Sequence, residues 1–260
     1  MQKKYLSQLP IVRREVINSG HFRLVLKVDQ GNIDVRPGQF VEIRVSGADG
    51  VLLRRPISVN DFNAQKGELS LLIHEVGAGT QQMAKFQVGS SVDIIFPLGN
   101  GFDLDEAGDA PLLVGGGVGV APLLFLGKEL VKRGAKPTFL FGARTANALL
   151  CLDEFRAVAP VIFTTEDGSD GTKGFVTDHA ALKEDAEANK FTSIMQCGPT
   201  PMMKAVGKRA QALNIKCFAS LENMMACGFG VCLCCVTDTI AGNKRVCADG
   251  PVFNVNDLKW

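Results

Sequence analysis

The stretch LLVGGGVGVAPL, residues 112–123, determines the fold class of the central part of this chain. Its apolar start indicates a buried strand, the glycines indicate a tight loop, and Pro122 stands where a helix would begin. Because glycine has no side chain, such a loop lets the main chain approach a dinucleotide closely. The candidate cofactor-binding residues of this loop are Gly115, Gly116, Gly117 and Gly119.

This loop departs from the common dinucleotide fingerprint in two ways. The spacing G-x-G-x-x-G fails at its last position, which is Val120. The next expected strand ends in Phe141-Gly142-Ala143-Arg144 and lacks the acid that usually binds a ribose. A conventional NAD dehydrogenase fingerprint is therefore absent, and tight strand–helix packing without a ligand is the alternative reading of these glycines.

The chain divides into three parts around this loop. Upstream, short strands separated by glycine turns are expected at 11–16, 22–28, 39–45, 69–75 and 92–96, which is typical of a small antiparallel β-barrel. In the middle, apolar strands at 111–114, 138–141, 161–164 and 193–196 alternate with helical stretches, which predicts a parallel α/β sheet. The last part, with an expected turn at Gly242-Asn243, is too short to form a stable core without a bound metal or a similar cross-link. We therefore predict a multidomain protein with boundaries at 1–102, 103–214 and 215–260.

Four cysteines in the last part carry the strongest chemical signal. They are spaced C-x4-C-x2-C-x11-C, the plant-type pattern for a [2Fe-2S] cluster, and they are Cys227, Cys232, Cys235 and Cys247. The neighbouring Cys234 is expected to be a bystander, because the x2 spacing selects Cys235. Four thiolates also suit tetrahedral zinc, so a zinc-stapled, non-enzymatic binding module stays open.

Two motifs in the first part suit a flavin nucleotide. In Arg55-Pro56-Ile57-Ser58, the proline favours an extended backbone at Arg55, whose guanidinium can donate two hydrogen bonds to a pyrophosphate. Ser58 can hydrogen-bond the polar edge of a flavin ring. Gly77-Ala78-Gly79-Thr80 precedes an expected helix at 81–86 whose first N–H groups could face an anion. A solvated arginine and an ordinary helix cap by Thr80 are the alternatives.

Composition excludes several classes of partner and location. The 260 residues contain 28 Lys and Arg against 27 Asp and Glu, a net charge of +1, with no basic stripe. We therefore expect no nucleic acid and no membrane partner. The polar N-terminus and the absence of a long apolar stretch predict a cytoplasmic protein. Eight cysteines in such a chain favour metal ligation over disulfides, with Cys151 and Cys217 packed as small apolar residues.

Taken in order, these motifs form a recognisable series. Arg-Pro-Ile-Ser, Gly-x-Gly-Thr, the glycine loop and Cys197-Gly198-Pro199 resemble the ferredoxin-NADP reductase superfamily. The stretch LENMMACGFGVC, residues 221–232, followed by 246–253, VCADGPVF, is similar to the electron-transfer subunit of type B dihydroorotate dehydrogenase. The resemblance covers essentially the whole chain.

The resemblance implies an oxidoreductase subunit that uses FAD, a [2Fe-2S] cluster and NAD(H). It implies electron transfer to or from a separate FMN-containing catalytic subunit, which oxidises dihydroorotate in pyrimidine (UMP) biosynthesis, in a heterotetramer with two of each chain. By position, FAD would be held by Arg55, Pro56, Ile57, Ser58, Leu72, Ile73, His74, Gly79 and Thr80. The matching Cys197 and Gly198 would lie near flavin and nicotinamide, and the cluster ligands would be Cys227, Cys232, Cys235 and Cys247.

A close alternative is the small subunit of a bifurcating NADH-dependent ferredoxin-NADP oxidoreductase or of a sulfide dehydrogenase. Those relatives commonly carry Asp at the first ligand, so Cys227 favours the dihydroorotate system. For the nucleotide, Glu166 and Asp167 stand where NADP-using relatives carry Ser and Arg. Two carboxylates would repel a ribose phosphate, which favours NAD over NADP.

No catalytic acid or base is predicted, because hydride transfer needs only stacking and exclusion of water. His21, His74 and His179 are isolated in the sequence. Glu222, just before the cysteine loop, is expected to be a solvated charge, with a place beside the flavin as the alternative.

Overall fold

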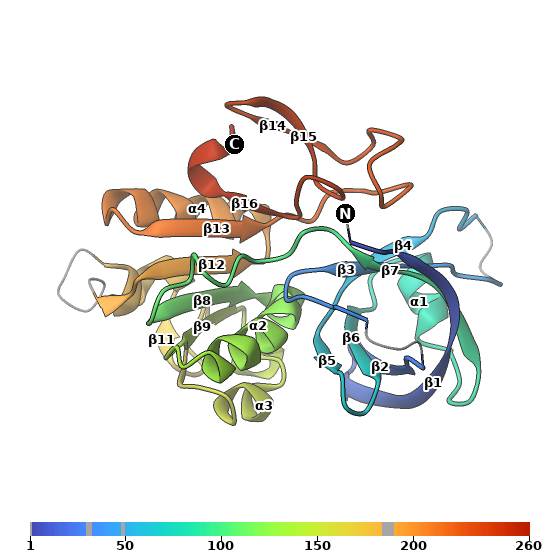
Figure 1. The fold of residues 1–260 in the computed structure, drawn as a ribbon. Coiled ribbons are helices and arrows are strands. Elements are labelled where there is room, and N and C mark those ends of the chain that lie inside the picture. Colours follow the sequence, from blue (N-terminus) through green and yellow to red (C-terminus); the bar gives the residue numbers. More distant parts are fainter. Residues whose placement is uncertain (1, 30–32, 48–49, 184–189) are drawn as a thin grey trace.

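The computed structural model describes residues 2–29, 33–47, 50–183 and 190–260 (Figure 1). Within them the strands form two seven-stranded sheets and one two-stranded ribbon. Figure 1 shows the two large sheets in separate domains, with the C-terminal segment lying across both. None of the helices in these ranges combines the length and apolar character needed to cross a bilayer.

The first domain is an antiparallel half-barrel, as predicted. Its sheet order is β4-β3-β7-β1-β2-β6-β5, and the short helix α1 (Ala78–Met83) packs beside it. The long β1 pairs with β7 through its first half and with β2 through its second half, which curls the sheet around one core. The strands are β1 (Tyr5–Asn18), β2 (His21–Lys27), β3 (Phe40–Ile43), β4 (Arg55–Ser58), β5 (Asp61–Asn63), β6 (Glu68–His74) and β7 (Ser91–Leu98).

The second domain is the expected α/β sheet, with order β11-β10-β9-β8-β12-β13-β16. All neighbours pair in parallel except β13 and β16. Its main elements are β8 (Pro111–Gly116), α2 (Ala121–Lys132), β9 (Thr138–Ala143), α3 (Leu152–Arg156), β10 (Val161–Thr165), β11 (Thr172–Lys173), β12 (Ser193–Cys197), α4 (Thr200–Ala212) and β13 (Lys216–Ser220). Short 3-10 turns cover Gly117–Val120, Ala146–Ala148, Val176–Asp178 and Ala180–Leu182.

The strand order of this sheet places a ligand crevice. From β8 the chain moves outward through β9, β10 and β11, and then returns to β12 on the other side of β8. In such sheets ligands bind outside the carboxyl ends of the strands at this switch point. The glycine loop after β8 and Gly198 after β12 lie there together.

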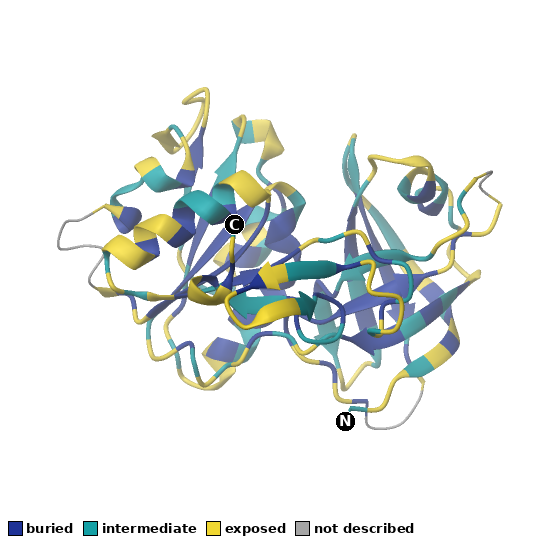
Figure 2. Cartoon of the chain, turned by 90° about the horizontal axis from the view of Figure 1, so that it is seen from above, coloured by how far each residue is buried: buried dark blue, intermediate teal, exposed yellow. Residues whose placement is uncertain are grey.

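The C-terminal segment consists of β14 (Val236–Thr239), β15 (Gly242–Arg245), β16 (Val252–Asn254) and the 3-10 turn Val255–Asp257. The hairpin turn falls at residues 240–241, so the turn expected at Gly242-Asn243 is wrong: Gly242 already pairs with Thr239. Strand β16 joins the α/β sheet beside β13. Figure 2, which looks onto this segment, shows it spanning the junction of the two domains.

Polar contacts fix the two domains against each other. The buried Asn60 side chain donates to the carbonyl of Ala121 at the start of α2 (2.9 Å). Lys128 pairs with Asp61 (2.5 Å), and Arg23 on β2 pairs with Glu154 on α3 (2.7 Å). The crevice between the domains therefore has a defined shape.

Candidate functional site

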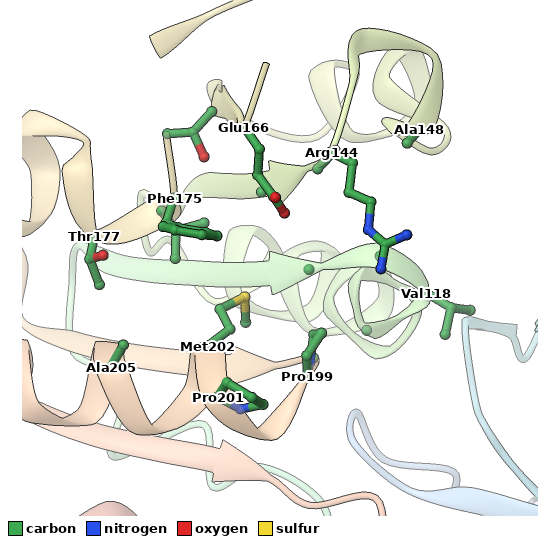
Figure 3. A pocket seen from close by; sticks show the side chains of 18 of the residues that line it. Val118, Arg144, Ala148, Glu166, Phe175, Thr177, Pro199, Pro201, Met202 and Ala205 are labelled. Atoms are coloured by element: carbon green, nitrogen blue, oxygen red, sulfur yellow. The ribbon is translucent and has the colours of Figure 1, made fainter. Parts of the chain in front are cut away.

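A cleft of about 780 Å³ opens at the carboxyl ends of β8, β9, β10 and β12 (Figure 3). His21 and His74 from the barrel and Glu222 from the C-terminal segment complete its wall. Of the predicted residues, Gly116, Gly117, Gly119 and Gly198 line the cleft. Gly115 and Cys197 lie buried in the strands beneath it.

The glycines of the loop serve two purposes. A Cβ added at Gly119 would lie 2.5 Å from the Cα of Gly198, so the close approach of the two loops requires glycine at 119. Gly117 has a φ of +55°, and nothing lies within 4 Å of an added Cβ there, so its backbone faces the open cleft. Tight packing without a ligand therefore explains the glycine at 119, whereas the backbone at Gly117 is free to contact a ligand.

Two histidines stack at the barrel end of the cleft. His21 and His74 are opposite each other in the β2–β6 ladder, with ring centroids 4.3 Å apart and planes 9° apart. The Nδ1 of His21 lies 2.9 Å from Asn18 Oδ1. Burial, and then the neighbouring His74, lower the pKa of His21, which favours the uncharged ring. The two histidines, isolated in the sequence, are brought together by the register of β2 and β6.

Glu222 lies in the cleft wall and contacts a buried thiol. The Sγ of Cys197 is 3.8 Å from Glu222 Oε1, and Cys197 is fully buried. The glutamate is accessible from the open cleft, yet the surrounding protein raises the pKa of its carboxyl group by desolvation. Glu222 therefore lines the cleft and is also exposed to solvent.

The two flavin motifs of the barrel lie against each other. A Cβ added at Gly79 would be 2.6 Å from Arg55 Nε, so glycine is needed for this contact. The Arg55 guanidinium donates to the carbonyl of Leu53 (2.7 Å). Helix α1 begins at Ala78, three residues earlier than expected. Thr80 Oγ1 accepts from the N–H groups of residues 76 (3.0 Å) and 77 (3.2 Å), which supports its role as a cap.

The remaining FAD candidates lie on β4 and β6. Pro56, Ile57 and Ser58 are half-buried on β4. Leu72 and Ile73 are buried on β6, and His74 reaches the cleft. The sequence motifs therefore meet along one edge of the barrel.

The four candidate ligands lie in a segment whose backbone N–H groups donate to cysteine sulfur atoms. The N–H of Val231 donates to Cys227 Sγ (3.4 Å), and the N–H of Cys247 donates to Cys235 Sγ (3.3 Å). Partial burial acts to raise the pKa of Cys227, but hydrogen bonds from backbone N–H groups outweigh it and lower this pKa to about 6. Gly228 and Gly230 have φ values of +75° and +90°, which the turn of this loop requires.

The donor set fits a two-iron cluster. Among the described residues no three or more His, Cys, Asp or Glu side chains converge on one metal-ion position. Besides burial, the side chain of Cys232 contributes to the pKa shift of Cys227, and that of Cys235 to the pKa shift of Cys247, so the thiols are neighbours in two pairs. Each iron of a [2Fe-2S] cluster takes two protein ligands, whereas zinc needs four donors around one point. The paired sulfurs and sulfur-directed N–H groups therefore suit [2Fe-2S].

The other cysteines lie outside these pairs. Cys234 is exposed, and its Sγ lies 3.7 Å from the carbonyl of Met224. Cys217 is buried, as expected for an apolar role. Cys151 is half-buried and accepts from the Arg23 guanidinium (3.4 Å), so its surroundings are more polar than expected.

An ion pair holds the cysteine loop to the hairpin behind it. Arg245 makes two side-chain hydrogen bonds of 2.9 Å to the carboxylate of Asp249, and its third nitrogen donates to the carbonyl of Gly230 (3.2 Å). These bonds, opposed by slight burial, lower the pKa of Asp249 to about 2. Asn100 also donates to the carbonyls of Ala248 and Asp249 (both 3.1 Å), which fixes the segment to the end of the barrel.

Sequence reasoning missed one residue beneath this loop. Glu42 on β3 has no exposed surface, and neither of its carboxylate oxygens has a hydrogen-bond partner among the described residues. Burial raises the pKa of Glu42 to about 7. In the sequence, Phe40–Ile43 reads as an ordinary strand, and nothing marks its glutamate as buried.

Together, a flavin-type half-barrel, a switch-point nucleotide cleft and a four-cysteine loop define an iron–sulfur flavoprotein reductase. Residues 8–102 match an oxidoreductase FAD-binding domain, and residues 113–208 match an oxidoreductase NAD-binding domain. Residues 222–259 match the iron-sulfur cluster binding domain of dihydroorotate dehydrogenase B. The chain belongs to the family of dihydroorotate dehydrogenase B electron transfer subunits.

Individual relatives support this membership. The dihydroorotate dehydrogenase B (NAD(+)) electron transfer subunit of Shouchella clausii (strain KSM-K16) is 38% identical over 264 residues, covering 99% of each chain. That of Bacillus caldolyticus is 40% identical over 228 residues, 86% of each. Among solved structures, a chain of the NADH-dependent reduced ferredoxin-NADP oxidoreductase is similar, with a TM-score of 0.86 and 31% identity over 98% of this chain and 90% of that one. The predictions of fold class, family and cofactor types are confirmed.

Proposed function

We propose that this chain carries electrons between the FMN of a dihydroorotate dehydrogenase catalytic subunit and NAD. The observation that supports this most directly is the paired-cysteine loop, which packs on the same barrel that carries the flavin motifs. When bound, FAD exchanges a hydride with nicotinamide and single electrons with the cluster. Orotate formation itself then requires the partner.

The domains and site residues are assigned as follows. The proposed boundaries at 1–102, 103–214 and 215–260 contain the three matched ranges, although β13 (Lys216–Ser220) of the third part pairs into the α/β sheet of the second. FAD is held along β4, β6 and the start of α1 by Arg55, Pro56, Ile57, Ser58, Leu72, Ile73, His74, Gly79 and Thr80. NAD lies in the cleft against Gly116, Gly117, Gly119 and Gly198, with Gly115 and Cys197 beneath. The cluster ligands are Cys227, Cys232, Cys235 and Cys247.

The residues of the cleft bind and orient rather than transfer protons. The stacked His21 and His74 form its barrel-side wall, and Glu222 with the buried Cys197 forms its wall on the cluster side. Hydride transfer needs a fixed stacking geometry and exclusion of water, and the interdomain contacts of Asn60 and Lys128 keep that geometry.

The partner docks at the cysteine loop in this proposal. Large apolar side chains are exposed around Cys232: Met224 is 86% exposed, Val231 73% and Leu233 62%. Exposed apolar residues grouped in this way mark protein interfaces. The proposed assembly is a cytoplasmic heterotetramer with two copies of each chain.

We predict that NADH reduces the bound FAD much better than NADPH does. Glu166 lines the cleft (Figure 3). The Asp167 carboxylate instead accepts from the hydroxyl (2.7 Å) and N–H (3.0 Å) of Ser169. Only one of the two predicted carboxylates therefore lines the cleft. Glu166→Gln should raise kcat/KM for NADPH roughly five- to tenfold, because it removes about 1 kcal/mol of repulsion.

Asp167→Asn is the matched control for this prediction and should leave the NADPH rate unchanged. Stopped-flow reduction of FAD by each nucleotide measures both variants. A wild-type chain that prefers NADPH would contradict the assignment of this end of the cleft.

Partner choice separates this function from that of a bifurcating small subunit, whose fold is similar. Co-expression with a dihydroorotate dehydrogenase catalytic subunit should give a stable complex in which dihydroorotate reduces NAD. A chain that binds no such subunit, and instead gives coupled ferredoxin and NADP reduction with a bifurcating large subunit, would favour the alternative.

A further inference from the structure

Glu42 occupies an unusual position for a carboxyl group. On β3, Val41 faces the barrel core, while Phe40 packs into the hydrophobic core that includes Cys235 and Cys247. Because side chains alternate along a strand, Glu42 shares the outer face with Phe40 and points toward the C-terminal segment. Its side chain has no exposed surface, and within the part of the chain that the structure describes both carboxylate oxygens lack a hydrogen-bond partner.

The cysteine loop lies directly over this carboxyl group. A Cβ added at Gly228 would be 2.6 Å from Glu42 Cγ and 3.0 Å from Oε1. Gly228 follows the first candidate ligand, Cys227, so the glutamate lies beneath the turn that presents this sulfur. The glycine at 228 is needed for the two segments to approach this closely.

The nearest arginine does not satisfy the carboxyl group. Arg54 pairs with Asp93 (2.7 Å), and its other nitrogen reaches the backbone carbonyl of Glu42 rather than the side chain (3.4 Å). A buried polar group without a partner destabilises the fold. Barrel packing alone gives no reason for this cost, since an apolar side chain would fill the same space.

We propose that Glu42 is a positioning residue for the cluster, whose carboxyl group hydrogen-bonds the loop at 227–229 once the cluster is in place. This inference rests on the proposed function. Hydrogen bonds around a cluster and its ligands govern its binding and its properties. The proposed hydrogen bond gives the carboxyl group of Glu42 a partner, which explains why a polar side chain stands at this buried position.

Two variants of Glu42 separate this role from packing. Glu42→Leu keeps the volume but removes the hydrogen bond, so iron release to a chelator should be roughly tenfold faster, which corresponds to about 1.4 kcal/mol. The same variant without iron should unfold at a temperature equal to or above that of the wild type. Glu42→Gln keeps hydrogen-bonding capacity and should release iron at the wild-type rate. FAD content near that of the wild type shows that the barrel is folded.

Glu68→Leu makes the same replacement on β6 of the barrel, where Glu68 pairs with Arg13, and should not change iron release. The inference is overturned if Glu42→Leu keeps iron as long as the wild type, or if Glu42→Gln loses it as fast as Glu42→Leu. If the wild-type chain itself holds no iron and sulfide, the proposed function fails instead.

Discussion

Replacing Cys232 with Ala is expected to abolish the visible absorption of the cluster and to reduce partner-dependent NAD reduction to background. Cys232 is exposed and belongs to the pair that would hold one iron with Cys227. Without it that iron lacks a protein ligand, and the cluster is not retained. NADH should still reduce an artificial dye through FAD in part, because the barrel and cleft do not depend on this side chain. Absorption spectra and the two activities measure these effects.

Cys234→Ala is the matched control, since Cys234 is also exposed, is two residues away and lies outside both thiol pairs. This variant should keep the cluster spectrum and the partner-dependent activity. A Cys232→Ala protein with an unchanged spectrum, or a Cys234→Ala protein without one, would refute the ligand assignment.

The second large effect is expected at Arg55. Arg55→Ala should weaken FAD binding roughly 10- to 100-fold, because charge-assisted hydrogen bonds to a phosphate contribute about 1.5–3 kcal/mol. The side chain lies against Gly79 and, among the described residues, its hydrogen bonds go to the backbone carbonyls of Leu53 and Arg54, so it is available to a pyrophosphate. Flavin content after purification and titration of the flavin-free protein with FAD measure the loss.

Two further variants sharpen the Arg55 test. Arg55→Lys keeps the charge but loses the planar fork, and we expect an intermediate affinity. Arg44→Ala removes a mostly exposed arginine whose ion pair with Asp93 is long (3.8 Å), and it should bind FAD normally. Full flavin content in Arg55→Ala would place the pyrophosphate elsewhere.

Much of the fold follows from local sequence patterns. The apolar runs that became β8, β9, β10 and β12 are each followed by polar or glycine-rich residues, so their parallel arrangement is predictable. Strands β13 and β16 were missed, because they are stabilised by their neighbours in the sheet rather than by a pattern of their own. The hairpin turn was misplaced by two residues, since Gly242 serves at the strand start with φ of +91°.

The residues of the site likewise fall into those that local sequence patterns identify and those that depend on contacts between distant segments. Cysteine spacing and the Arg-Pro-Ile-Ser motif are local, so the sequence identifies them directly. The His21–His74 stack depends on the register between β2 and β6, and the burial of Glu42 depends on a segment that begins some 180 residues later. The first contact arises from strand pairing within the barrel, and the second arises only when the C-terminal segment packs on the barrel.

The central claim is that the C-terminal cysteines hold an iron–sulfur cluster beside a flavin. Its most direct test is the iron, zinc, acid-labile sulfide and FAD content of the chain purified without oxygen. We expect yellow-brown protein with about two irons and two sulfides per chain, as this cluster type requires, together with one FAD. Colourless protein that contains zinc, no sulfide and no flavin would contradict it.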